Sequence, residues 1–85
     1  MRLKIKKKIL MKIERKHKIK LNEIYEVLEG RFYYEKIKGN RYKIIGKTES
    51  GRFVTLFVDK LRTFELVTAR DSTDVEKRLY KKKVG

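Results

Sequence analysis

The sequence predicts an α+β fold with two N-terminal helices, a three- to four-stranded antiparallel sheet and one C-terminal helix. Apolar residues recur with a helical period in the first third of the chain. From position 31 onward, aromatic and β-branched stretches alternate with short turn sequences. A capping sequence near position 73 then opens a last helical segment. We expect one domain, 1–85, because the chain contains no repeat, no linker-like stretch and no proline.

Two amphipathic segments are expected to form the N-terminal helices. In residues 3–17 isoleucines recur at steps of four, as on one face of a helix, although the first few residues are equally compatible with a strand. A second helical pattern runs over 21–28, and Gly30 is a typical C-terminal stop. The break near 18–20 is marked by neither a glycine nor a capping side chain.

The middle of the chain predicts an antiparallel meander. The expected strands are 32–34, 42–45, 53–58 and 64–69, and the expected turns are 38–40, 48–51 and 59–62. Such a sheet must cover one face, and the amphipathic helices are the elements available for it. Thr73 and Glu76 have the spacing of a capping box, with Val75 and Leu79 as the apolar positions of a short closing helix.

Positive charge is the strongest compositional signal. The chain has 25 Lys and Arg against 11 Asp and Glu, a formal net charge of +14, and residues 1–20 contain a single acid, Glu14. A field of this sign attracts polyanions. A lysine-rich soluble surface of the thermophile kind is the alternative, but that bias raises Glu together with Lys. We therefore expect a polyanionic partner, RNA in particular.

Composition disfavours several other classes of protein. The absence of Cys excludes disulfides, thiol nucleophiles and Cys-based metal sites. A single His and scattered carboxylates predict no metal centre, and we expect no cofactor. No run of 18 apolar residues predicts a membrane span, and the basic start lacks the apolar stretch of a signal peptide. A cytoplasmic location is expected.

Four groups of residues stand out as candidates for a site. They are Lys16-His17, then Arg41-Tyr42 with Gly46 and Gly51-Arg52, then Thr68-Ala69-Arg70, and finally Glu76 with Tyr80 one helical turn later. Their order and spacing resemble the BrnT family of toxins, small ribonucleases of type II toxin–antitoxin pairs. The resemblance covers residues 13–81. Its most specific part is the Ala-Arg-x₅-Glu-x₃-Tyr tail with the upstream Lys-His.

The resemblance implies a RelE-like fold, metal-independent RNA cleavage and a cognate antitoxin that carries a DNA-binding domain. The RelE-like arrangement of helices on an antiparallel sheet agrees with the elements predicted above. Such an antitoxin should be acidic or present an acidic segment to this basic chain. The chain departs from the family in having Lys18 where a glycine is usual, and residues 1–12 lack the usual Trp- and Asp-containing strand.

Metal-free RNA cleavage must deprotonate a 2′-OH, stabilise the phosphorane and protonate the leaving 5′-oxygen. Arginine offers planar paired donors to phosphate, and histidine transfers protons near neutral pH. We therefore assign the phosphate to Arg70, Arg52 and Arg41, proton transfer to His17 and Glu76, and positioning to Lys16 and Tyr80. The predicted catalytic residues are thus His17, Arg70, Glu76 and Arg52, and the predicted substrate-binding residues are Lys16, Arg41 and Tyr80.

Three of these residues also have a structural interpretation. His17 continues the isoleucine stripe, Glu76 is the capping partner of Thr73, and Tyr80 lies beside the apolar Leu79. The competing function is a non-catalytic basic module that holds RNA or DNA by its phosphates. A third is a toxin that has lost its activity and serves as an antitoxin or scaffold.

Overall fold

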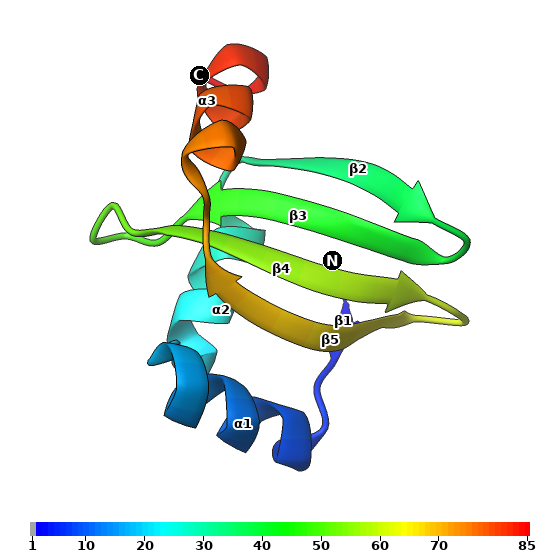
Figure 1. Cartoon of the computed structure of the whole chain (residues 1–85). Helices are drawn as coiled ribbons and strands as arrows, with labels where there is room; N and C mark the ends of the chain where they lie inside the picture. Colours follow the sequence, from blue (N-terminus) through cyan, green and yellow to red (C-terminus); the bar gives the residue numbers. More distant parts are fainter. Residues whose placement is uncertain (1) are drawn as a thin grey trace.

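A computed structural model describes residues 2–85, which form three helices and five strands (Figure 1). In chain order they are β1 (Leu3–Lys4), α1 (Lys7–His17), α2 (Leu21–Glu29), β2 (Phe32–Lys38), β3 (Arg41–Lys47), β4 (Phe53–Lys60), β5 (Phe64–Asp71) and α3 (Asp74–Lys83). The predicted α+β class, with two helices before the sheet and one after it, is confirmed. None of the three helices is long and apolar enough to cross a bilayer.

The strands form one sheet in the order β1-β5-β4-β3-β2. The four long strands are antiparallel, as predicted. The fifth strand, β1, is two residues long and pairs parallel to β5, and it comes from the segment that was compatible with a strand as well as a helix. The turn expected at 59–62 begins later, because β4 continues through Lys60, whose amide donates to the carbonyl of Asn40.

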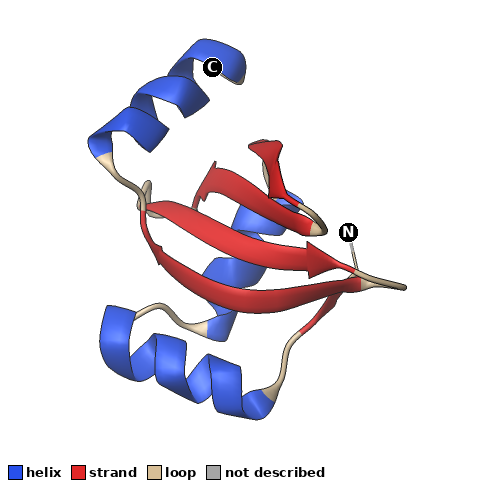
Figure 2. Cartoon of the chain, turned by 45° about the vertical axis from the view of Figure 1, so that its right-hand side comes forward, coloured by secondary structure: helices blue, strands red, loops and turns tan. Residues whose placement is uncertain are grey.

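Helices α1 and α2 cover one face of the sheet (Figure 2). The core between them contains Leu3, Ile13, Ile19, Ile24, Val27, Leu28, Ile44, Val54, Leu56, Val58, Leu66 and Ala69. Gly46 lets α2 come close to β3, since a Cβ at this position would lie 2.8 Å from Cγ1 of Val27. The isoleucine stripe of the sequence is therefore the face that α1 buries.

The opposite face of the sheet is called the open face below. Directly paired residues of antiparallel strands point to the same side. By this register the open face carries Tyr33, Glu35, Lys43, Ile45, Lys47, Phe53, Thr55, Phe57, Thr68 and Arg70. Helix α3 lies over one end of it, where β3 ends and β4 begins, and leaves the rest uncovered (Figure 1).

Two local devices make the tight corner between α1 and α2. Lys18 ends α1 in the left-handed region, with φ 56° and ψ 35°, a conformation for which glycine is preferred. The amide of Lys20 then donates to Oε1 of Glu23 at 2.9 Å, which satisfies a free donor at the start of α2. The break predicted at 18–20 is thus confirmed, with lysine in the place of a capping glycine.

The left-handed backbone at Lys18 generates a prediction. Lys18→Gly should stabilise the fold by about 1 kcal/mol, because glycine adopts this conformation without the penalty of a Cβ. The matched control is Lys12→Gly, also exposed and on α1, which should destabilise by about 1 kcal/mol. Urea unfolding measures both. If Lys18→Gly destabilised as much as Lys12→Gly, the left-handed cap would be contradicted.

Candidate functional site

Arg70 and Glu76 form a paired salt bridge at the end of the open face that α3 covers. Arg70 Nη1 lies 2.8 Å from Oε1 of Glu76, and Nη2 lies 2.9 Å from Oε2. Arg70 is the second-last residue of β5, and Glu76 lies in the first turn of α3. The structure thus brings together two of the predicted catalytic residues.

The carboxylate of Glu76 is buried, with 4% of the residue exposed, and surrounded by donors. Besides Arg70, Oε1 accepts from the Thr73 amide at 2.8 Å and the Thr55 hydroxyl at 3.0 Å, and Lys43 Nζ lies 3.5 Å from Oε2. Burial alone would raise the pKa of Glu76, but these hydrogen bonds outweigh it and lower the pKa to about 2. Glu76 is therefore ionised at neutral pH and a weak base. The predicted capping box with Thr73 is confirmed.

Arg70 keeps one edge of its guanidinium unused. Nη1 donates to Glu76 and to the backbone oxygen of Asp71, and Nη2 donates one bond to Glu76. Within residues 2–85, Nε and the second hydrogen of Nη2 have no hydrogen-bond partner. These two N–H groups point the same way and form a fork that matches two oxygens of a phosphate. The guanidinium carbon also lies 5.1 Å from the ring centroid of Phe57, which supports it from the sheet.

Arg52 lies next to the Arg70–Glu76 pair, but its contacts hold the end of α1 against the sheet. Its Nε and Nη2 bind the Asp71 carboxylate at 2.7 and 3.2 Å. Nη2 and Nη1 also donate to the backbone oxygens of His17 and Lys18, at 2.9 and 2.8 Å, and Nη1 reaches Glu23. All five donors are engaged, so Arg52 fastens the end of α1 to the sheet and has none free for phosphate.

His17 is joined to Arg70 through Arg52 and Asp71. Arg52 binds both the backbone oxygen of His17 and the Asp71 side chain, and Asp71 in turn accepts from Arg70 through its backbone. The pKa of Asp71 is lowered first by its hydrogen bond with Arg52, and charge interactions with Arg52 and His17 contribute to the same shift. The end of α1 therefore meets the end of β5, and the four predicted catalytic residues gather at one end of the sheet.

The predicted substrate-binding residues are less concentrated. Lys16 is exposed beside His17 at the end of α1. Tyr80 is buried, its hydroxyl donates to the Arg31 backbone oxygen at 3.1 Å, and its ring meets Phe53 edge-on. Arg41 pairs with Asp59 at the far end of the sheet, four positions along β4 from Thr55, the partner of Arg70, or roughly 13 Å. The structure does not bring Arg41 to the site.

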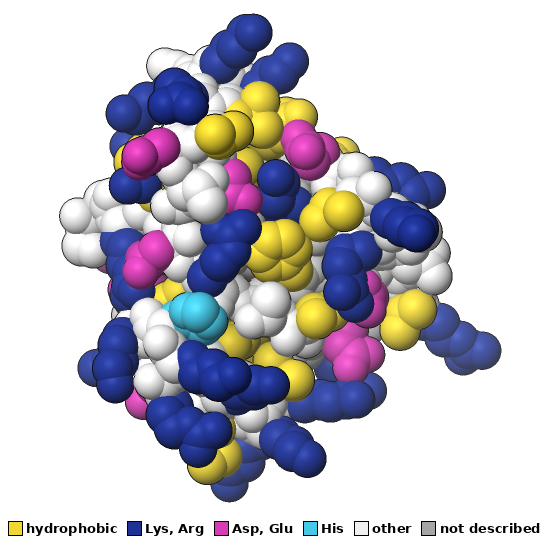
Figure 3. Space-filling view, viewed as in Figure 1, with side chains coloured by type: hydrophobic (Ala, Val, Ile, Leu, Met, Phe, Trp, Pro, Cys, Tyr) yellow, Lys and Arg dark blue, Asp and Glu magenta, His cyan; other side chains and the backbone are white. Residues whose placement is uncertain are grey.

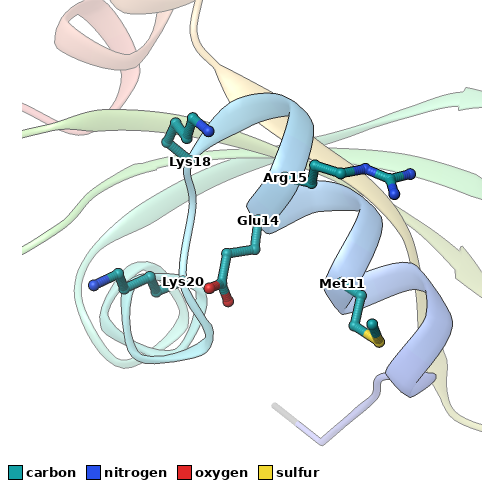
Figure 4. A pocket seen from close by; sticks show the side chains of 5 residues that line it. All are labelled: Met11, Glu14, Arg15, Lys18 and Lys20. Carbon is teal, nitrogen blue, oxygen red and sulfur yellow. The ribbon is translucent and has the colours of Figure 1, made fainter.

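The open face carries basic side chains around an apolar centre (Figure 3). A separate hollow lies in the corner between α1 and α2 and is lined by Met11, Glu14, Arg15, Lys18 and Lys20. The side chains there splay apart rather than converge, and none of the predicted site residues lines the hollow (Figure 4). The convergent polar groups lie on the open face instead.

Comparison with models of protein families gives no match for this chain, and no curated protein matches it either. The resemblance to the BrnT toxins therefore stays a prediction, which rests on the order and spacing of the residues and on the architecture.

The sequence does not predict several residues that belong to the site. Thr55, Lys43 and Phe57 all surround the Arg70–Glu76 pair, but they belong to β3 and β4. Thr55 lies directly opposite Arg70 only through the register of β4 with β5. The alternation of residues 53, 55 and 57 was the available signal, because it places them on one face of a strand.

The buried ion pair generates a prediction about acid stability. The folded pKa of Glu76, about 2, lies below its ordinary value of 4.5, so its contribution is fully present above that value and is lost as the pH falls toward 2. Wild type should lose roughly 3 kcal/mol more than Glu76→Gln across this window. Urea unfolding at a series of pH values measures the difference.

The control is Asp59→Asn, which removes the carboxylate of the exposed pair with Arg41. It should leave most of the acid dependence in place, because exposed pairs are screened by solvent. Parallel stability curves for wild type and Glu76→Gln would contradict the coupling of Glu76 to Arg70.

Proposed function

We propose that this protein is a metal-independent endoribonuclease that acts as the toxin of a type II toxin–antitoxin pair. The observation that carries the proposal is the free edge of Arg70, held on an open, basic sheet face by a buried carboxylate. Two parallel donors in a fixed position suit the charge that builds up on a phosphorane. The net charge of +14 supplies the general attraction for RNA.

The roles within the proposed site follow from the contacts. Glu76 orients Arg70 and does not take a proton, because a carboxylate with a pKa of about 2 is a poor base at neutral pH. Proton transfer is assigned to His17, the single imidazole of the chain, at the neighbouring end of α1. Arg52 and Tyr80 hold α1 and α3 in place, and Arg41 lies outside the proposed site.

The proposed antitoxin covers the open face with an acidic segment. Arg70 and the lysines of this face are the groups that such a segment would neutralise, and opposite charges across an interface speed association and fix its register. Covering Arg70 would block the phosphate site directly. Silencing the enzyme therefore needs no conformational change in this chain.

A non-catalytic module that holds RNA or DNA is the second candidate. The saturated Glu76 favours it, since the carboxylate nearest to Arg70 is committed to four donors and supplies no general base. Both candidates use the same phosphate site and differ in whether the bound strand is cut.

The prediction concerns RNA cleavage with EDTA present. The double variant Arg70→Gln/Glu76→Gln removes the fork and leaves no unpaired charge in the buried position, so the protein should stay folded. Circular dichroism checks the fold. It should lose on the order of 10²- to 10³-fold in cleavage rate, the usual effect of removing a transition-state donor. The matched control, Arg41→Gln/Asp59→Asn, makes the same exchange at the far end of the sheet and should cleave like wild type.

Equal cleavage by the two double variants would refute the assignment of Arg70. Salt-sensitive RNA binding without cleavage, lost in Arg70→Gln/Glu76→Gln and kept in the control, would instead support the binding module.

A further inference from the structure

Three lysines surround one aromatic ring on the open face. The Nζ atoms of Lys47, Lys77 and Lys81 lie 5.6, 5.9 and 5.7 Å from the ring centroid of Phe53. Lys47 comes from β3, directly opposite Phe53, and the other two occupy successive turns on one side of α3. Below they are called the Phe53 lysine cluster.

The cluster lacks the carboxylates that usually accompany gathered lysines. No Asp or Glu of residues 2–85 makes a salt bridge with any of the three. Asp71, whose charge interacts with Lys77, is already paired with Arg52. The ring attracts each ammonium group, but the three like charges repel one another. A multivalent anion between them would relieve that repulsion.

The position of the cluster relates it to Arg70. Phe53 and Thr55 are two residues apart on β4 and point to the same side, and Arg70 lies directly opposite Thr55. The backbone position of Phe53, the centre of the cluster, is therefore displaced from that of Arg70 by roughly 7 Å along the strand and one strand across the sheet. A displacement of this size suits neighbouring phosphates of one extended nucleic-acid strand.

We propose that the Phe53 lysine cluster is a second phosphate site, which holds the phosphate next to the one bound by Arg70. The inference rests on the proposed function for its ligand, a single RNA strand. Thr55, which lies between Phe57 and Phe53 on β4, is buried, and its hydroxyl contacts Glu76 of α3. The strand therefore crosses the start of α3, with one phosphate at Arg70 and the next among the three lysines. Two sites of different chemistry, a rigid guanidinium fork and three flexible ammonium groups, fix the direction in which the strand crosses the sheet.

The first experiment compares two probes, UpU with one phosphate and UpUpU with two, titrated into the protein and followed by NMR chemical shifts. In wild type the second phosphate should raise affinity by roughly tenfold or more, as expected for an added contact between charged groups. The variant Lys47→Gln/Lys77→Gln/Lys81→Gln should bind both probes equally. The matched control, Lys36→Gln/Lys38→Gln/Lys60→Gln, loses the same charge at the other end of the sheet and should keep the gain.

The second experiment measures how the affinity for a single-stranded decamer depends on salt. The cluster variant should lose about 0.7 from the slope of log K against log salt, the value for one phosphate of a single strand. An equal loss in the control variant would overturn the inference, because the lysines would then act only through net charge. A gain from the second phosphate that survives in the cluster variant would overturn it as well.

These outcomes are independent of cleavage. If wild type binds UpUpU more tightly than UpU, the cluster variant loses this gain and no RNA is cut, the nuclease proposal fails and the second phosphate site stands. If RNA is cut but the cluster variant behaves like its control, the second site fails and the nuclease stands.

Discussion

The buried carboxylate of Glu76 is the interaction on which the functional end of this fold depends. A carboxylate removed from water is costly unless donors surround it. Here the donors come from three elements: Thr55 on β4, Arg70 on β5 and the Thr73 amide at the start of α3. The same contacts anchor α3 across one end of the sheet, hold Arg70 at a fixed angle and leave the remaining face uncovered.

The chain uses its arginines and lysines differently. Arg41, Arg52 and Arg70 each form a paired contact with a carboxylate, so much of their charge is balanced locally. Most lysines have no such partner within residues 2–85, and the net charge of +14 therefore comes mainly from them. Arginine fixes geometry through its planar fork, whereas lysine contributes a mobile charge. The proposed interface needs both, one for placing a phosphate and one for attracting the strand.

The sequence predicted the elements well because their signals are local. Apolar periodicity identified α1 and α2, and the Thr73–Glu76 spacing identified the start of α3. The sequence does not distinguish strand from helix at β1, because the pairing of this strand with β5 joins distant parts of the chain. The surroundings of Arg70 were unpredictable for the same reason: the partner of a strand residue depends on register, and a bulge between Phe57 and Val58 shifts the register of β4 with β5. Arg41 was predicted as a site residue from its position in the sequence pattern alone, and the fold places it at the far end of the sheet.

The three paired arginines differ in how many of their N–H donors remain free for a ligand. The donors of Arg52 are exhausted by Asp71, Glu23 and two carbonyl groups. Arg41 retains donors, but its partner Asp59 is partly exposed, and such a pair is weakly held in water. Arg70 combines a free fork with a buried partner and a supporting ring. A donor pair that is already fixed loses little entropy when a phosphate arrives, and this preorganisation makes Arg70 the residue best suited to stabilise developing charge.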